Sequence, residues 1–233
     1  MEALMEQLYN GFTLEIPPDS FPLSTDSMVL ADFVRLSKNA NVLDLGSGCG
    51  TLGLLLCAAD PGCTVTGVEI CKSSHRAAEE NILQNSLQSR MKSICADLRA
   101  IPSLLPAGSF SCCVSNPPYF SGGPASKTNP LARRDDLCTT ADLFRSAAWA
   151  LHYGGDFFLV HKPDRLAQLC SCASQAGLEP KRLRIISHRP ESKPAMILLQ
   201  CRKGAAPGLI WEQISLFHAD GSPTPAYKKI YHL

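Results

Sequence analysis

The stretch NVLDLGSGCGTLGLLLCAA, residues 41–59, decides how the rest of the chain is interpreted. Residues 41–45 are mostly apolar and predict a buried strand, while residues 51–59 predict a helix that Pro61 and Gly62 end. Three glycines, at 46, 48 and 50, lie between them. A strand, a glycine-rich turn and a helix in this order are typical of the first unit of an open α/β sheet, whose ligand binds beyond the carboxyl ends of the strands.

Strands and helices alternate along the chain on both sides of this unit. Further strands are predicted over 64–70, 91–97, 109–115 and 156–161, and helices over 27–36, 72–86, 140–152 and 163–177. Two last strands, 181–187 and 195–203, leave no room for a helix between them and predict an antiparallel pair. We therefore predict a Rossmann-like α/β fold with a doubly wound, mostly parallel sheet and an antiparallel C-terminal hairpin.

The chain has 233 residues, which fits one domain. We expect this single domain, 1–233, to comprise an N-terminal extension with a helix (1–40), a core (41–203) and a C-terminal tail (204–233). The first ten residues lack the pattern of a signal peptide, and no run of 18 apolar residues indicates a membrane helix. A cytoplasmic protein without membrane contact is therefore expected.

The distribution of charge along the chain indicates which kinds of ligand the protein binds. Residues 1–110 hold 7 Lys/Arg and 12 Asp/Glu, a charge of −5, and residues 111–233 hold 15 and 9, a charge of +6, which together give +1. An acidic first half suits a cationic ligand and a basic second half suits an anion such as RNA.

The 11 cysteines include no C-x-x-C pair and the histidines no H-E-x-x-H spacing, so no metal site is expected. Free cysteines in apolar runs are typical of a reducing compartment.

The glycine loop indicates a nucleoside-containing cofactor without naming it. Gly48, Gly50 and Gly53 satisfy the dinucleotide pattern G-x-G-x-x-G, but that register begins three residues after the strand. Gly46, directly after the strand, begins a G-x-G-x-G loop that is typical of S-adenosylmethionine sites. Both cofactors remain open on the glycines alone.

Three carboxylates follow strands of the predicted sheet and favour the second cofactor. Glu69 can take two ribose hydroxyls of either cofactor, and Asp97 can accept from an adenine amino group. Asp44 lies at the end of the first core strand. Because S-adenosylmethionine carries a sulfonium and an ammonium whereas NAD carries a pyrophosphate, acids at this edge lean toward S-adenosylmethionine.

The tetrapeptide Asn116-Pro117-Pro118-Tyr119 ends the fourth core strand, beside the same edge. An exocyclic amine is a weak nucleophile because its lone pair is delocalised. The Asn116 side-chain oxygen and the Pro117 carbonyl can accept its two N–H groups and free that lone pair, and the prolines fix both oxygens. Tyr119 offers a flat face on which a planar group stacks. The motif therefore predicts that the protein methylates an exocyclic amine of its substrate, which Asn116, Pro117 and Tyr119 bind.

With these motifs the chain resembles the class I S-adenosylmethionine-dependent amino-methyltransferases, and most closely the bacterial family that methylates N6 of adenine-37 in a valine tRNA. The resemblance rests on FPLSTDSMVLADF, VLDLGSGCGTLGLLL, TGVEI, VSNPPYF, GGDFFLVHKPDRL and KRLRIISHRPESKPAMILLQCRKG. It implies S-adenosyl-L-methionine as cofactor and tRNA as partner. It also implies cofactor positions at Thr25, Asp26, Asp44, Gly46, Gly48, Glu69, Asp97 and Asn116.

The candidate RNA contacts are basic residues in two segments. Lys127, Arg133 and Arg134 lie in the long segment after Tyr119, where long loops are often functional, and Gly122-Gly123 suits a hinge. Lys181 and Arg182 begin a second basic run, for which a solvated face is an equal alternative. The family usually has Ala-Arg-His-Glu where this chain has Ala132-Arg133-Arg134-Asp135, which bears on target preference.

Other functions stay open as alternatives. A protein glutamine N5-methyltransferase shares N-P-P-Y but generally adds an N-terminal helical domain, and only 40 residues precede NVLDL here. An rRNA guanine N2-methyltransferase usually has N-P-P-F and a duplicated domain, and a DNA adenine methyltransferase needs a target-recognition region. A noncatalytic nucleotide- or RNA-binding module would not need N-P-P-Y beside the glycine loop.

Overall fold

The computed structural model describes residues 4–17, 23–117 and 138–233. The first core unit forms with the predicted bounds: strand β3 covers Asn41–Leu45 and helix α2 covers Thr51–Ala59. Gly50 is the N-cap residue of α2, and its φ of +88° lies in the left-handed region that a glycine adopts most readily. The glycine turn therefore joins strand to helix as the sequence predicts.

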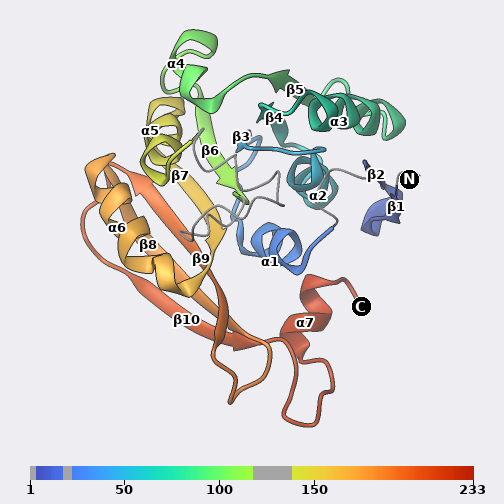
Figure 1. Cartoon of the computed structure of the whole chain (residues 1–233), viewed down its shortest axis with the longest axis vertical. Coiled ribbons are helices and arrows are strands. Elements are labelled where there is room, and N and C mark those ends of the chain that lie inside the picture. The colour runs from blue at the N-terminus through green and yellow to red at the C-terminus, as the bar shows by residue number, and fades with distance from the viewer. Residues whose placement is uncertain (1–3, 18–22, 118–137) are drawn as a thin grey trace, which may run out of the picture.

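One large sheet is the centre of the fold (Figure 1). Its remaining strands are β4 (Thr64–Glu69), β5 (Met91–Cys95), β6 (Phe110–Ser115), β7 (Leu151–His161), β8 (Leu178–Ser187), β9 (Pro194–Lys203) and β10 (Ile210–Ser215). Their spatial order is β10-β8-β9-β7-β6-β3-β4-β5. Among the described strands of this sheet, only β9 runs antiparallel to its neighbours, β7 and β8. The predicted mostly parallel sheet with an antiparallel β8–β9 pair is confirmed.

The chain reverses its direction of growth between β3 and β6. From β3 it adds β4 and then β5 on one side, and it returns to place β6 and β7 on the other side. Open α/β sheets bind ligands at such a switch point, outside the carboxyl ends of the strands. The residues after β3 and β6 are the glycine loop and Asn116, which come from distant parts of the sequence.

Helices cover both faces of the sheet because its strands are apolar on both sides. On β6, Cys112 and Val114 pack into one core cluster and Cys113 into the other, as side-chain alternation requires. The first face carries α1 (Thr25–Phe33), α2 and α3 (Lys72–Gln84); the second carries α4 (Ile101–Leu104), α5 (Thr140–Ala150) and α6 (Leu166–Gln175). None of the helices in the described ranges is both long and apolar enough to span a bilayer.

The junction of α5 and β7 differs from the prediction. The helix predicted over 140–152 ends at Ala150, and the strand predicted over 156–161 begins at Leu151. Leu151 is fully buried and pairs with Phe110, after which the register shifts so that Asp156 pairs with Cys112. Burial of Leu151 in the sheet therefore overrides the local helix pattern, and Gly154-Gly155 lie within the irregular stretch.

Both flanking segments hold elements that the sequence analysis did not assign. Residues 204–233 contribute strand β10, which pairs in parallel with β8, and helix α7 (Pro225–Ile230), which packs against α1 and β10. The N-terminal segment forms a hairpin of β1 (Leu4–Gln7) and β2 (Thr13–Ile16), which lies beside α3 (Figure 1). Leu14 and Ile16 of β2 are buried in the core, so this hairpin is an integral part of the first layer.

Candidate active site

The glycine loop is anchored to the neighbouring strand by backbone hydrogen bonds. The N–H groups of Gly46 and Ser47 both donate to the carbonyl of Val68, at 2.9 and 3.2 Å. Gly46 and Gly48 have φ values of +75° and +56°, and nothing lies within 4 Å of the position a Cβ would take at either residue. These two glycines therefore serve the backbone conformation and leave open space beside the loop.

Glu69, at the end of β4, ties the loop to the start of α3. One of its carboxylate oxygens accepts from the Gly48 N–H at 2.9 Å and the other from the Cys71 N–H at 2.7 Å. A carboxylate oxygen has more than one acceptor direction, so both remain capable of a second hydrogen bond. Glu69 thus organises the loop itself, a role that the sequence analysis did not assign to it.

Asp44 is a buried carboxyl near the end of β3. Within the described part of the chain, neither of its carboxyl oxygens accepts or donates a hydrogen bond, and the same holds for the Ser47 hydroxyl. Burial, and then the nearby charge of Glu69, raise the pKa of Asp44 to about 8. A buried carboxyl in this state is stabilised as a carboxylate when positive charge lies beside it, so the site fits a cationic ligand.

Asn116 follows β6 at the switch point and is held from α1. Its side-chain nitrogen donates to the hydroxyl of Ser27 at 3.0 Å. Ser24 caps α1, and its hydroxyl oxygen accepts from the Ser27 N–H at 3.4 Å. Ser27 was not predictable from the sequence, because its partner lies 89 residues away and a serine in the first turn of a helix has ordinary local explanations.

Thr25, which the resemblance assigns to the cofactor site, is also contacted from the C-terminal segment. Its hydroxyl oxygen lies 3.0 Å from the hydroxyl of Tyr231, which donates to it. Tyr231 stacks on Tyr227 of α7 with ring centroids 4.3 Å apart. Asp26 lies next to Thr25 in the first turn of α1. The start of α1 is therefore positioned by a part of the chain that the sequence analysis left as a tail.

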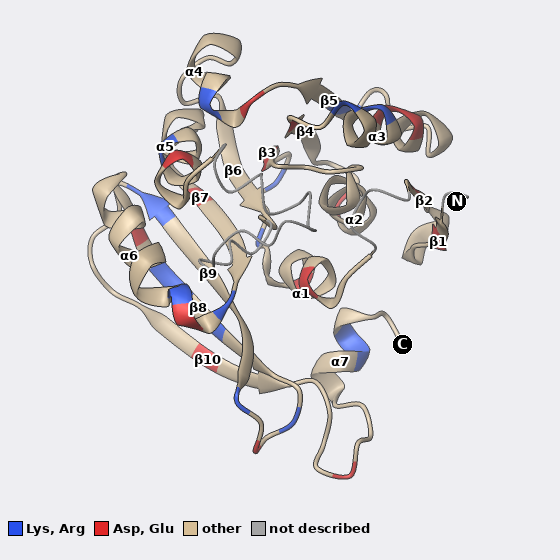
Figure 2. Cartoon of the chain, in the orientation of Figure 1, with Lys and Arg blue, Asp and Glu red and all other residues tan. Residues whose placement is uncertain are grey.

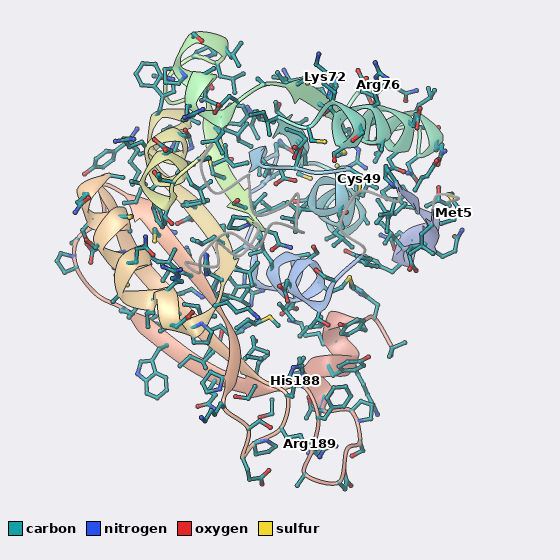
Figure 3. The ribbon with its side chains drawn as sticks, viewed as in Figure 1. Met5, Cys49, Lys72, Arg76, His188 and Arg189 are labelled. Carbon is teal, nitrogen blue, oxygen red and sulfur yellow. The ribbon has the colours of Figure 1, made fainter. Side chains whose placement is uncertain are left out.

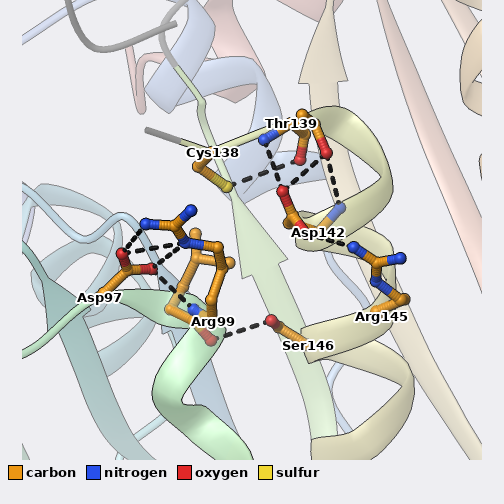
Figure 4. Close-up of polar contacts among 8 residues, drawn as sticks. Asp97, Arg99, Cys138, Thr139, Asp142, Arg145 and Ser146 are labelled. Carbon is orange, nitrogen blue, oxygen red and sulfur yellow. Dashed lines mark hydrogen bonds and ion pairs between the residues drawn. The ribbon is translucent and has the colours of Figure 1, made fainter. Parts of the chain in front are cut away.

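Asp97, after β5, is engaged by an arginine (Figure 4). The guanidinium of Arg99 contacts both carboxylate oxygens, with a closest distance of 2.5 Å, and holds the pKa of Asp97 below its usual range. The capping box of Thr139 and Asp142 at the start of α5 lies beside this pair. An adenine amino group at Asp97 would therefore share the carboxylate with Arg99.

Asn81 on α3 and Asn85, the C-cap residue of that helix, hold the N-terminal hairpin, and neither was singled out from the sequence. The Asn81 side chain accepts from the N–H of Glu15 at 2.7 Å, and donates to the Glu15 carbonyl at 2.9 Å and to the Cys49 carbonyl at 3.0 Å. Asn85, one turn later, makes the same two-way contact with Thr13. Figure 3 labels Cys49, which precedes α2. The spacing of four residues was the available sequence signal, because it aligns two side chains on one helix face.

The candidate RNA residues are dispersed. Arg182 lies with its guanidinium 4.4 Å from the centre of the Phe33 ring and 3.7 Å from the carboxylate of Glu212, so it links α1 to the sheet. Lys181 is half-buried and donates to the Ala206 carbonyl at 2.9 Å. Basic residues are spread over many elements (Figure 2), and the His188-Arg189 turn is far from Lys72 and Arg76 of α3 (Figure 3). Tyr119, Lys127, Arg133, Arg134 and the Gly122-Gly123 hinge lie outside the described residues.

The switch point thus brings together Asp44, Gly46, Gly48, Glu69 and Asn116. Thr25 and Asp26 share the first turn of α1 with Ser27, the residue that contacts Asn116. Asp97 follows the next strand outward, β5, whereas Lys181 and Arg182 belong to β8, on the other side of the sheet. The described part of the site is therefore a set of oxygen acceptors around the glycine loop and contains no basic side chain from the candidate RNA residues.

Comparisons with known proteins identify the family of the chain. The family model described as "Methyltransferase small domain" matches residues 23–168. Among curated proteins, the chain is 28% identical over 194 residues to a tRNA1(Val) (adenine(37)-N6)-methyltransferase of Bacteroides fragilis, covering 82% of this chain and 81% of that protein. A protein of the same name from Tolumonas auensis is 29% identical over 223 residues, covering 94% and 92%.

Solved structures show the same fold. A predicted O-methyltransferase from Agrobacterium tumefaciens superposes with a TM-score of 0.75 at 20% identity, covering 89% of this chain and 96% of that chain. A 16S rRNA N2 methyltransferase from Thermus thermophilus, solved with AdoMet and guanosine, gives 0.61 at 23% identity, covering 87% of this chain and 50% of that chain. Because the family model spans more than half of the sequence, the chain belongs to the methyltransferase small domain family.

Proposed function

We propose that this protein is an S-adenosylmethionine-dependent methyltransferase whose target is N6 of an adenine in tRNA. The observation that carries the proposal is the position of Asn116. It follows β6 at the switch point, beside the loop after β3, and its side-chain nitrogen is engaged by Ser27. Its side-chain oxygen is thereby the end of the amide that is left for a target.

The loop residues supply a fitting cradle for the cofactor. Asp44 is a buried carboxyl without a partner among the described residues, and positive charge on a ligand would stabilise its ionised form. Gly46 and Gly48 leave space for close approach, Glu69 has acceptor capacity for ribose hydroxyls, and Asp97 has it for an adenine amino group. When bound, S-adenosylmethionine supplies an electrophilic methyl group.

The chain's own part in the reaction is to prepare the target nitrogen. The Asn116 side-chain oxygen and the Pro117 carbonyl accept the two N–H groups of the amine, which withdraws the nitrogen lone pair from the ring and directs it outward. Stacking on Tyr119 holds the base flat. The extra proton leaves after transfer, so no strong base is needed. A target in a tRNA loop is accessible because loop bases are readily turned out of their stack.

The choice of tRNA as substrate rests on the curated relatives. Their names specify tRNA1(Val), and they align with most of this chain. A tRNA substrate also suits the expected cytoplasmic location. The test is to incubate the purified protein with S-adenosylmethionine and tRNA from a strain lacking the gene, and to analyse the nucleosides by mass spectrometry. We expect new N6-methyladenosine in one tRNA. If no N6-methyladenosine forms, parallel incubations with protein and with rRNA would identify an alternative target, as N5-methylglutamine or N2-methylguanosine respectively.

Replacement of Asn116 tests the site. We expect Asn116→Ala to lower the rate of methyl transfer by a factor of about 100 or more, because an acceptor used in the transition state is lost. The Kd for S-adenosylmethionine, measured by calorimetry, should stay within a few fold, because Asn116 acts mainly on the target. A loss of cofactor binding would show that Asn116 faces the cofactor or supports the fold, and absence of binding to the folded wild-type protein would refute the methyltransferase proposal altogether.

A further inference from the structure

We infer that Ser27 is a positioning residue, which fixes the end of the Asn116 amide that faces the target amine. The inference rests on the proposed function, in which the Asn116 oxygen accepts from that amine. Ser27 is 6% exposed, and its hydroxyl oxygen lies 3.0 Å from the side-chain nitrogen of Asn116. A contact between a helix on one face of the sheet and the end of a central strand joins two elements that the reaction needs to keep aligned.

The amide needs such an anchor because its two ends differ in chemistry but hardly in shape. The oxygen end accepts hydrogen bonds and the nitrogen end donates two. A rotation by half a turn exchanges them, and the nitrogen end would then direct its N–H groups at those of the target amine. Two donors facing each other do not bond, so only one orientation of Asn116 is productive.

The surroundings of the Ser27 hydroxyl favour that orientation. A hydroxyl has one hydrogen and two acceptor positions. The Ser24 hydroxyl oxygen lies 3.5 Å away and accepts from the Ser27 backbone N–H, so it also provides an acceptor for the Ser27 hydroxyl hydrogen. With its hydrogen directed at Ser24, Ser27 presents lone pairs to Asn116 and selects the nitrogen end of the amide. Helix capping and amide orientation are therefore linked through one pair of serines.

Replacement of the hydroxyl tests the inference kinetically. We expect Ser27→Ala to lower kcat for tRNA methylation about tenfold, because one oriented hydrogen bond is lost and the amide becomes free to turn. KM for tRNA and the Kd for S-adenosylmethionine should stay within about twofold. Ser27→Thr retains a hydroxyl and should recover part of kcat.

Ser115→Ala is the matched control. Ser115 immediately precedes Asn116, is fully buried, and donates its hydroxyl to the Leu45 carbonyl at 2.7 Å without contacting the Asn116 amide. The Ser115→Ala variant therefore also removes a buried hydroxyl close to Asn116, but one that does not hold the Asn116 amide. We expect kcat of this variant to stay near the wild-type value. An equal fall of kcat in both variants would mean that loosening of the strand end is responsible, and would overturn the inference.

A measurement on the amide itself separates the inference from the proposed function. In 15N-labelled protein the side-chain amide signal of Asn116 is identified by its absence from Asn116→Ala. We expect its protons to exchange with solvent more slowly in the wild type than in Ser27→Ala. Equal exchange in the two proteins would overturn the inference whatever the reaction, whereas slow exchange in a wild type that methylates no RNA would overturn only the proposed function.

Discussion

A single carboxyl, Asp44, sets a conflict between stability and ligand binding at the centre of this site. It is buried with no hydrogen-bond partner in the part of the chain that the structure describes, and its pKa is raised to about 8 by burial and by Glu69. In the unfolded chain the same group ionises near pH 4. The folded protein consequently holds a proton on Asp44 that the unfolded chain has already released at neutral pH.

This difference predicts how stability changes with pH. Between about pH 4 and about 8 the folded state binds more protons than the unfolded state, so Asp44 makes stability fall as pH rises, by up to about 1.4 kcal/mol per pH unit. Asp44→Asn cannot ionise and should lose this part of the pH dependence. Urea unfolding of both proteins at several pH values checks the slope. We expect the variant to gain stability relative to the wild type as pH rises, and to bind S-adenosylmethionine more weakly.

Parallel slopes for the two proteins over that pH range would contradict the assignment of the raised pKa to Asp44.

The acid itself was predictable from sequence, because Asp44 ends a strand ahead of a glycine loop. Its missing partners were not, because they depend on what the fold brings near it. Ser27 was hidden for the converse reason: its partner is remote in sequence and its own surroundings explain a serine equally well.

Among the elements, the predictions succeeded where a segment carries its own pattern. β3 and α2 have the predicted bounds, since a continuous apolar run and a glycine stop are sufficient to define them. β10 and α7 were missed, although Ile210, Trp211 and Ile214 favour a strand and Thr224-Pro225 is a helix start. The N-terminal hairpin has only four residues in each strand, and much of its anchorage comes from side chains of α3 and of its C-cap residue.

Asn81 of α3 and Asn85, the C-cap residue of the same helix, provide a matched pair at this scale. We expect Asn81→Ala to destabilise the protein by about 2–3 kcal/mol, because three backbone groups of Glu15 and Cys49 lose a partner. It should also weaken S-adenosylmethionine binding, since Cys49 belongs to the loop. Asn85→Ala removes the contacts with Thr13 and should destabilise without changing cofactor affinity. Unfolding and calorimetry of both variants check this, and equal affinities in the two variants would refute the coupling through Cys49.

For the molecule as a whole, an ionic cluster joins the first helix layer, the sheet and the C-terminal helix. The carboxylate of Asp32 on α1 accepts from Arg184 of β8 at 2.8 Å and from Lys229 of α7 at 2.6 Å. Arg184 also contacts Glu212 of β10 at 2.8 Å. The hydrogen bonds from Lys229 and Arg184 outweigh the effect of burial and hold the pKa of Asp32 below its usual range.

The two cations of this cluster differ in exposure, and this gives a whole-molecule prediction. The Arg184 side chain is 8% exposed and the Lys229 side chain 64%. We expect Arg184→Ala to lower the free energy of unfolding by about 3 kcal/mol, because two carboxylates lose their buried partner. Lys229→Ala should lower it by less than about 1 kcal/mol, because an exposed pair contributes little. Chemical denaturation checks both, and similar losses would show that α7 depends on Lys229 as strongly as the sheet depends on Arg184.

The asparagine contacts with β2 have a consequence for how freely this part of the sequence can vary. Asn81 and Asn85 bind the backbone of Glu15 and Thr13 and make no demand on their side chains, apart from the separate contact of Gln84 with Glu15. Substitution at positions 13 and 15 therefore leaves the attachment intact for every residue that has an amide hydrogen. Proline is the exception, since it has no backbone N–H and would remove the hydrogen bond that this group donates at either position. The side chains at these two hairpin positions can therefore change while the hydrogen bonds from the hairpin backbone to Asn81 and Asn85 are kept.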